Sequence, residues 1–211
     1  MAQQPAPSGA SVSLVHPPGE ADLVKRCKTR EPAALRTLFE RERWHVHRLL
    51  YRVVGSNTHM DDLMQDTFLE VFRSLPSFRG DSSLRTWILR CAVRVAYAHC
   101  RRKARLPALA PVQDIASDAP GPEERTSRRE AARRLYAELD RLEPSQRMAF
   151  TLFAVEGRTL REVAEIMEST LTTAKVRAWR ARRKLKGRAR RDPLLSEFLA
   201  GRLEQKEASA Q

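Results

Sequence analysis

The chain has 211 residues, of which 39 are Lys or Arg and 26 are Asp or Glu, and its formal net charge at pH 7 is +13. This excess of positive charge indicates a polyanionic partner, although charge alone does not separate nucleic acid from an acidic membrane or an acidic protein. No apolar run approaches the ~20 residues of a membrane-spanning helix. No phosphate-binding glycine loop or hydrolase motif is present either, so we expect neither a membrane span nor an enzyme.

The three cysteines, Cys27, Cys91 and Cys100, indicate a reducing compartment. Their number is odd and no two form a Cys-x-x-Cys pair, which argues against a disulfide framework. Reduced thiols are typical of a cytoplasmic protein, which is the localisation we expect. His99 beside Cys100 offers two metal ligands, but no second cluster completes a set of four, so we expect neither a metal nor a cofactor.

Apolar residues recur at helical spacing through the chain and alternating strand patterns are almost absent, so the predicted fold class is all-α. Residues 1–19 are rich in Pro, Ser and Ala and are predicted to form a disordered N-terminal segment. A first helical domain is predicted at 20–105. Its expected helices are Glu20–Thr29, Pro32–Gly55, His59–Leu75 with Thr58 as the N-cap, and Ser83–Arg105, with a loop at Pro76–Ser83.

The composition changes after the first domain. Residues 106–122 hold four prolines and little periodic hydrophobicity, which predicts a flexible linker between two small helical domains. The second domain is predicted at 123–187, and the tail at 188–211 is expected to form a short helix after Pro193 and to fray beyond Gly201. The expected helices of the second domain are Glu123–Leu142, Pro144–Glu156, Thr159–Met167 and Thr170–Lys186.

The last two of these helices have the pattern of a helix-turn-helix. Thr159 precedes Glu162 by three residues, the spacing of a capping box, and Thr170 can cap a second helix after a short break. That second helix is basic throughout, as expected of a helix that lies in the DNA major groove. The alternative is an amphipathic hairpin with a solvated basic face. The basic residues are Lys175, Arg177, Arg180, Arg182, Arg183, Lys184 and Lys186.

The predicted helix at His59–Leu75 carries an acidic face that is conspicuous in so basic a chain. Asp61 and Asp62 lie in its first turn, where acids favour the helix dipole by ~0.3–1 kcal/mol. Asp66 and Glu70 lie beyond that turn, so a basic partner surface explains them better.

The predicted loop Pro76–Ser83 and the predicted helix Ser83–Arg105, which follow the acidic helix, combine aromatic side chains with cations. Opening a DNA duplex needs a cationic surface for the backbone and a platform or pocket for an extruded base. Trp87 lies on the apolar stripe of its helix, so core packing and base stacking both remain open for it. Arg101 and Arg102, near the end of the same helix, are expected to meet phosphate.

In this order, the patterns resemble a sigma-70 family factor of the extracytoplasmic-function (ECF) group, proteins that direct bacterial RNA polymerase to promoters. The resemblance covers about 35–103 and 138–186. The segments that carry it are Asp61–Phe72, Phe78-Arg79-Gly80 with Ser83–Ile88, Leu142–Arg147 with Glu156-Gly157, and Arg161–Met167 with Thr173, Lys175, Arg177 and Arg180–Leu185.

The resemblance implies an alternative sigma factor whose second domain is a helix-turn-helix of the winged-helix-like, sigma region 4 type. It implies three partners: core RNA polymerase through its β′ clamp helices and β flap, promoter DNA, and an anti-sigma factor. The residues implied for polymerase binding are Asp61, Asp62, Gln65, Asp66 and Glu70. Those implied for binding and melting the −10 element are Phe78, Arg79, Ser82, Ser83, Arg85, Trp87, Arg90, Arg94, Arg101 and Arg102. Those implied for the −35 element are Thr172, Thr173, Lys175, Val176, Arg177, Arg180, Arg182, Arg183 and Lys184.

The sequence departs from the family pattern at two places. Glu168 stands where the turn of the helix-turn-helix usually carries Gly, at a position that often needs a left-handed backbone costing other residues ~1 kcal/mol or more. In the melting helix, Arg94 stands where the family often has Asn, and Ala98 where it often has Asp. Trp179 is expected in the core, because Val176 and Leu185 fall near the same stripe.

Two other classes of function compete with this interpretation. A transcriptional regulator would use the helix-turn-helix without any sigma activity, but a sensor domain has no need for an acidic helix beside a basic one. A helical nuclease would need converging carboxylates for metal ions, and no second acidic helix faces Asp61–Glu70 in the predicted arrangement.

Overall fold

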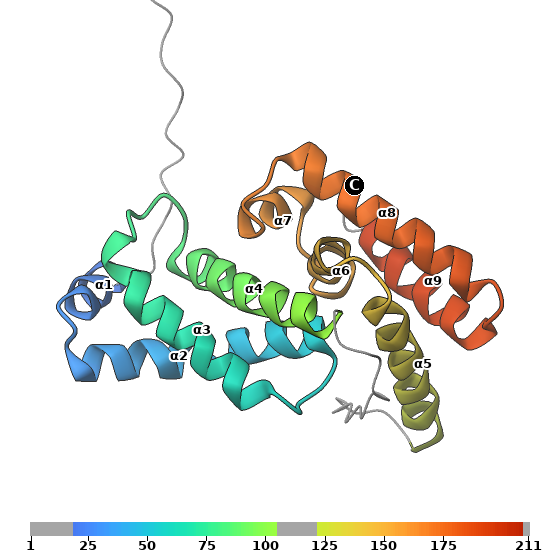
Figure 1. Ribbon diagram of the computed structural model, residues 1–211, viewed down its shortest axis with the longest axis horizontal. Helices are drawn as coiled ribbons and strands as arrows, with labels where there is room; N and C mark the ends of the chain where they lie inside the picture. Colours follow the sequence, from blue (N-terminus) through green and yellow to red (C-terminus); the bar gives the residue numbers. More distant parts are fainter. Residues whose placement is uncertain (1–18, 105–121, 209–211) are drawn as a thin grey trace, which may run out of the picture.

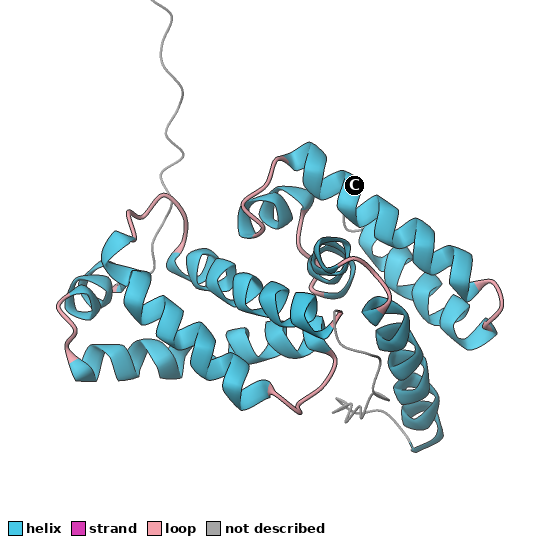
Figure 2. Ribbon diagram, in the orientation of Figure 1, coloured by secondary structure: helices cyan, strands magenta, loops and turns pink. Residues whose placement is uncertain are grey.

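The computed structural model describes residues 19–104 and 122–208, and every regular element within these ranges is a helix (Figure 2). The predicted all-α fold class is therefore confirmed. The helices form two lobes that lie side by side (Figure 1). The first lobe comprises α1 (Glu20–Lys28), α2 (Pro32–Val54), α3 (Met60–Ser74), the short 3-10 helix η1 (Leu75–Ser77) and α4 (Leu84–Lys103). The second lobe comprises α5 (Pro122–Asp140), α6 (Pro144–Phe150), the π-helical turn η2 (Thr151–Val155), α7 (Leu160–Ile166), α8 (Leu171–Ala189) and α9 (Pro193–Ala208).

The long helix α2 is the centre of the first lobe and packs against α1, α3 and α4. It begins with Pro32, whose missing amide hydrogen costs nothing in a first turn. It ends at Gly55, whose backbone has a φ of 74° and whose amide donates to the carbonyl of Tyr51 at 2.7 Å. A left-handed residue after the last turn is a common helix terminator, and Gly adopts it without a steric penalty.

The prediction that Thr58 caps α3 is wrong. The helix begins at Met60, and no side chain caps it. The Thr58 hydroxyl instead forms a hydrogen bond of 2.7 Å with the hydroxyl of Ser56, and the Thr58 amide donates to the same Ser56 oxygen. Thr58 is therefore committed to the loop that precedes α3.

The two predicted caps of the helix-turn-helix are confirmed. At the start of α7, the Glu162 amide donates to the Thr159 hydroxyl at 3.2 Å, and the Thr159 amide donates to the Glu162 carboxylate at 2.8 Å. At the start of α8, the Thr173 amide donates to the Thr170 hydroxyl at 3.1 Å. A short helix and a long helix, each with a capped N-terminus, thus flank the turn.

Two predicted helices differ from what the structure shows. The expected helix Pro144–Glu156 is α6 followed by the π turn η2, in which the Glu156 amide donates to the Thr151 carbonyl at 2.8 Å. The expected fraying beyond Gly201 is wrong, because α9 continues to Ala208. Leu195 and Leu199 of α9 are buried against α5 and α8, which gives this helix an apolar anchor.

One hydrophobic cluster spans both lobes, and a second cluster lies within the second lobe. Helix α4 of the first lobe packs against α6 and α7 of the second (Figure 1). Leu89 on α4 belongs to the same buried cluster as Met148 on α6 and Leu152 on η2. The expected disordered segment at 1–19 and the expected linker at 106–122 lie, apart from Gly19 and Pro122, outside the described residues.

Candidate nucleic-acid interface

The acidic face of α3 is open to solvent. Asp61, Asp62, Gln65 and Asp66 are exposed, and within the described residues the three aspartates form no ion pair with any of the many cations. Glu70 differs, because its carboxylate lies 3.5 Å from the Arg94 guanidinium on α4. Three uncompensated carboxylates on one face of a helix form a surface suited to a basic partner.

The loop before α4 is anchored by an aromatic pair. The rings of Phe78 and Trp87 lie 5.4 Å apart between centroids, and Phe78 is only 7 % exposed. The Phe78 carbonyl accepts a hydrogen bond of 2.7 Å from the Lys28 ammonium. Ser82 is also buried, whereas Arg79 is exposed. Phe78, Trp87 and Ser82 thus hold the loop in place, and Arg79 is the side chain that it presents.

The start of α4 is held to α2 by a buried carboxylate that the sequence interpretation missed. Glu42 is 1 % exposed, accepts a hydrogen bond from Arg85 Nε at 3.0 Å and forms an ion pair with Arg41, whose Nε lies 3.1 Å away. A charge is costly to bury unless it is paired, and Glu42 has two guanidinium partners. The available signal was its position midway between Leu38 and Val46 on the apolar stripe of α2. Arg85 is therefore engaged within the first lobe.

Two cations on α4, Arg90 and Arg94, face the second lobe. Arg90 Nη2 lies 2.9 Å from the Glu165 carboxylate on α7, and Arg94 Nη1 lies 3.8 Å from the Glu168 carboxylate in the turn after α7. Burial alone would lower the pKa of Arg94, but the neighbouring Cys91 sulfur and the carboxylates of Glu168 and Glu70 raise it above its usual value. Arg94 is therefore fully charged.

The last turn of α4 presents further cations. Arg101 and Arg102 are exposed, and Lys103 is paired with Asp140 of α5 at 2.7 Å. Cations at a helix C-terminus are favoured by the helix dipole, so these arginines have a structural role even without a ligand. The same exposed guanidinium groups can bind phosphate.

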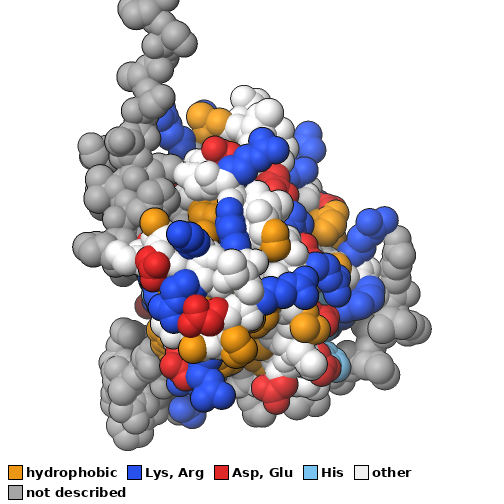
Figure 3. Space-filling model, turned by 90° about the vertical axis from the view of Figure 1, so that its left-hand side faces the viewer, with side chains coloured by type: hydrophobic (Ala, Val, Ile, Leu, Met, Phe, Trp, Pro, Cys, Tyr) orange, Lys and Arg blue, Asp and Glu red, His pale blue; other side chains and the backbone are white. Residues whose placement is uncertain are grey.

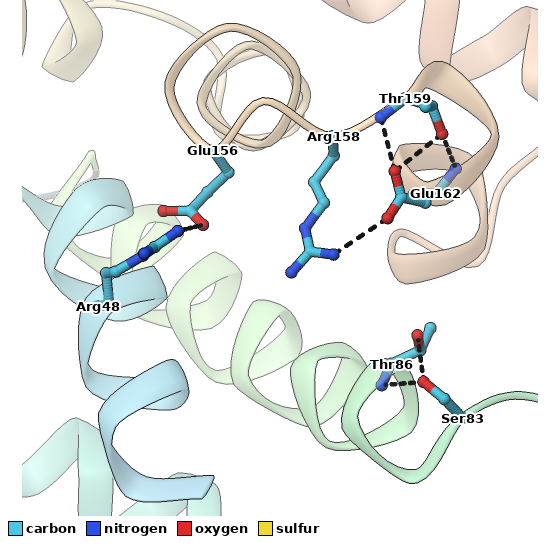
Figure 4. Close-up of polar contacts among 7 residues, drawn as sticks. All are labelled: Arg48, Ser83, Thr86, Glu156, Arg158, Thr159 and Glu162. Carbon is cyan, nitrogen blue, oxygen red and sulfur yellow. Dashed lines mark hydrogen bonds and ion pairs between the residues drawn. The ribbon is translucent and has the colours of Figure 1, made fainter. Parts of the chain in front are cut away.

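The helix-turn-helix has a strained turn. Glu168 has a φ of 47°, the left-handed conformation expected for this position, and it is exposed. The capping box lies at the other end of α7: Figure 4 shows the Thr159 and Glu162 side chains in reciprocal contact, with Arg158 reaching the Glu162 carboxylate at 3.0 Å. The capping box satisfies the N-terminus of α7, and α7 packs against α8.

Helix α8 is buried on a stripe of small residues. Ala174, Ala178, Ala181 and Leu185 are buried, and α8 packs closely against α6. The expectation that Trp179 lies in the core is therefore wrong: it is 56 % exposed, with the Arg183 guanidinium 5.5 Å from its ring centroid. Thr172, Lys175, Val176, Arg180, Arg183 and Lys184 are exposed, and Thr173, Arg177 and Arg182 are half-buried.

The positive charge is not confined to one patch. On the face seen in Figure 3, which is the left-hand side of Figure 1, Lys and Arg side chains spread over the surface with acidic side chains among them. A patch of charge therefore does not identify the DNA-binding residues. We select candidate cations by the helix that carries them and by whether an acidic side chain already pairs with them.

Comparisons with known proteins agree with this arrangement. Residues 38–106 match the family model for sigma-70 region 2, and residues 132–185 match the model for sigma-70 region 4. The ECF RNA polymerase sigma-E factor of Haemophilus influenzae is 31 % identical over 173 residues, which are 76 % of this chain and 89 % of that protein. The sigma-E factor of Escherichia coli K12 is 30 % identical over 170 residues, covering 76 % of this chain and 88 % of that one.

Two solved structures share the fold. CnrH, solved in complex with the cytosolic domain of CnrY, has a TM-score of 0.59 at 21 % identity and covers 82 % of this chain and 99 % of its own. The sigma factor RpoE of Bartonella quintana, solved with the anti-sigma factor NepR, has a TM-score of 0.56 at 19 % identity, with 74 % and 97 % covered. Within the described ranges, no helix combines the length and apolarity that crossing a membrane requires.

The region 2 model matches residues of the first lobe, and the region 4 model matches residues of the second lobe. The two relatives, at 31 % and 30 % identity, extend the match across most of both proteins. The chain therefore belongs to the extracytoplasmic-function group of the sigma-70 family and is an alternative sigma factor that directs transcription initiation.

Proposed function

We propose that this sigma factor docks on core RNA polymerase through the acidic face of α3, and that it opens and reads promoter DNA through α4 and α8. The observation that carries the proposal is the separation of charge between these helices. In a chain of net charge +13, the exposed aspartates of α3 have no ion-pair partner among the described residues, while α8 carries only cations.

For α3, the proposed partner is the basic surface of the β′ clamp helices. Asp61, Asp62 and Asp66 supply charge, and Gln65 adds a hydrogen-bonding group on the same face. Glu70 lies at the edge of this face, where it already pairs with Arg94. Complementary charge of this kind steers association and fixes the docking orientation.

For α4 and the preceding loop, the proposed partner is the −10 element as it melts. Arg79, Arg94, Arg101 and Arg102 are exposed and suited to phosphate, and Arg90, half-buried beside Glu165, is the further cation of this helix that faces the second lobe. Phe78, Ser82, Ser83, Arg85 and Trp87 act by holding the loop and the start of α4 in position.

For α8, the proposed partner is the major groove of the −35 element. Residues early in a recognition helix face base edges, so Thr172, Lys175 and Val176 are the proposed sites of direct readout. The exposed Trp179 continues this face by one turn. Residues proposed mainly for phosphate contact or for support of the helix are Thr173, Arg177, Arg180, Arg182, Arg183 and Lys184.

Two further partners follow from the family. We propose that the second lobe also contacts the β flap of the polymerase. We also propose that an anti-sigma factor regulates this protein, since both structural neighbours were solved with a bound protein partner, one of them the anti-sigma factor NepR.

Co-purification with core polymerase tests the docking surface. The double substitution Asp62→Lys with Asp66→Lys should abolish binding, because both positions are exposed and would then repel a basic partner. The matched control is Glu40→Lys with Glu197→Lys, which changes the net charge equally at exposed positions on α2 and α9. Retention of both variants on the polymerase would remove α3 from the binding surface.

A further inference from the structure

The ammonium of Lys28, at the end of α1, binds a backbone group far away in the chain. It donates a hydrogen bond of 2.7 Å to the carbonyl of Phe78, which lies 50 residues further along the sequence. A lysine in the last turn of a helix is ordinarily explained by the helix dipole. The dipole accounts for the charge of Lys28 but not for its partner, because the accepting carbonyl belongs to the loop before α4.

Helix α1 is itself held in place, so it can serve as a fixed point for this loop. Leu23 and Cys27 are buried in the hydrophobic cluster that also contains Phe78. At the start of α1, Glu20 is 3 % exposed, and its carboxylate lies 2.6 Å from the Arg41 guanidinium on α2. The helix also packs against η1, which leads into the loop (Figure 1). The lysine ammonium therefore projects from an element whose position is set by the hydrophobic core.

The hydrogen bond to Phe78 bears directly on the next residue, Arg79. A peptide unit is planar, so a contact that holds the Phe78 carbonyl also fixes the orientation of the Arg79 amide in the same unit. The rest of Phe78 is fixed as well. Its ring is buried beside Trp87, and its amide donates to the Leu75 carbonyl at 3.0 Å. The backbone is therefore fixed on the N-terminal side of Arg79.

The other end of the loop is fixed at the start of α4. Ser82 is buried, and the Ser83 hydroxyl accepts a hydrogen bond of 3.1 Å from the Thr86 amide (Figure 4). The segment between the two fixed ends is Arg79–Asp81, in which the arginine and the aspartate are exposed. Holding both ends of so short a segment restricts its conformations, and a loop that is already ordered loses less entropy when it binds a ligand.

We propose that Lys28 is a positioning residue for promoter opening. By holding the Phe78 carbonyl, it keeps Arg79 in the orientation that meets the DNA strand as the duplex separates. This inference rests on the proposed role of the loop in melting the −10 element. The match to the sigma-70 region 2 model covers residues 38–106, so it includes the loop but assigns no role to α1.

The test uses holoenzyme assembled from core RNA polymerase and the full-length chain, on a promoter identified by its mapped start site. Lys28→Met removes the charge and the donor but keeps an unbranched apolar side chain, whereas Lys28→Arg keeps both the charge and a donor. The matched control, Lys25→Met, removes an exposed cation of the same helix that forms no ion pair with the described residues. Arg79→Ala is the reference variant for the loop, and circular dichroism checks that every variant is folded.

Run-off transcription is compared on the duplex promoter and on a template whose −10 region is mismatched and therefore already open. On the duplex, Lys28→Met should give about fivefold less transcript, as expected from losing one hydrogen bond that orders the loop, whereas Lys28→Arg and Lys25→Met should stay within about twofold of wild type. On the open template, Lys28→Met should also stay within about twofold of wild type, because the strands no longer have to be separated.

A double-mutant cycle separates positioning from a direct contact of Lys28 with DNA. If Lys28 acts through Arg79, adding Lys28→Met to Arg79→Ala should cause little further loss on the duplex. If Lys28 instead bound a phosphate itself, the two losses would multiply, because independent contacts contribute additively to the free energy.

Wild-type transcription by Lys28→Met on the duplex, beside a defective Arg79→Ala, would overturn the inference and leave the role of the loop intact. So would an equal loss of transcript on the duplex and open templates, or losses that multiply in the double variant. Full activity of Arg79→Ala on the duplex would instead contradict the proposed role of Arg79 in opening, and the inference with it, without affecting docking through α3.

Discussion

The guanidinium of Arg147 in the second lobe donates a hydrogen bond of 2.6 Å to the carbonyl of Val53, in the last turn of α2 in the first lobe. A helix leaves its last carbonyls without partners inside the helix. Arg147 thus completes a helix end that lies in the other lobe: its Nη2 donates to the Val54 carbonyl, and its Nη1 pairs with Asp140. Arg147 is therefore one of the side chains that link folding of α2 to packing of the lobes.

Arg147→Met should destabilise the protein strongly. It leaves the Val53 and Val54 carbonyls and the Asp140 carboxylate without their buried partner, and removing one member of such a set costs on the order of 3 kcal/mol. Urea unfolding followed by circular dichroism measures the change. The control, Arg141→Met, removes an exposed guanidinium paired with Glu138 and should shift stability by less than about 0.5 kcal/mol. Equal midpoints for the two variants would contradict the role of Arg147.

Gly55→Ala should also destabilise the protein, by roughly 1–3 kcal/mol. Gly55 has a φ of 74°, and a Cβ there would collide with the ring of Tyr136 on α5. The matched control is Gly187→Ala in α8, where a Cβ would meet no atom within 4 Å beyond the adjacent residues and the backbone of its own helix. That change should stabilise the helix by about 0.5–1 kcal/mol. Thermal unfolding compares the two, and a harmless Gly55→Ala would show that Tyr136 does not lie against this turn.

Stability should depend on pH through Asp140. Burial alone would raise the pKa of Asp140, but the charge of Arg147 and the contact with Lys103 outweigh it, so its pKa lies below the usual 3.8. A carboxyl whose pKa is lowered on folding stabilises the protein above its unfolded pKa, and this contribution is lost as the pH falls through the folded pKa. The free energies of unfolding of wild type and Asp140→Asn should therefore differ at pH 6, and the gap should begin to close only as the pH falls below about 4. A gap that stays constant with pH would contradict this.

Two substitutions in α8 should have different effects, one on overall affinity for promoter DNA and the other on which promoter sequence is preferred. Arg183→Ala removes an exposed cation that also contacts the Trp179 ring, so binding should weaken alike on all promoters, with a salt slope lower by about one. Lys175→Ala, early in α8, should change which promoters are preferred. Binding to a promoter library at several salt concentrations measures both effects. A Lys175 variant with wild-type preferences would refute its role in base readout.

Much of this fold follows from local chemistry. The capping box of Thr159 and Glu162 and the cap at Thr170 were predictable, because their partners lie three residues away in the chain. The absence of a cap at Thr58 was not predictable, because the Thr58 hydroxyl forms a hydrogen bond with the nearby Ser56 hydroxyl instead.

The features that we could not predict from the sequence depend on contacts between residues that are far apart in the chain. Trp179 and the alanines of α8 both occur at helical spacing, and which stripe is buried depends on how closely α6 approaches. The contacts of Arg94 with Glu168 and of Arg147 with Val53 span long stretches of chain, and no local periodicity encodes them. Arg90 and Arg94 were thus predicted as DNA-binding residues from their helix, whereas their acidic partners became visible only in three dimensions.

Run-off transcription with core RNA polymerase freed of other sigma factors tests the central claim most directly. Genomic fragments serve as templates, and the 5′ ends of the transcripts are mapped. The wild-type protein should produce discrete start sites that are absent without it, and Asp62→Lys with Asp66→Lys should abolish them. Folded wild-type protein that yields no specific start on any template would contradict its assignment as the factor that directs initiation.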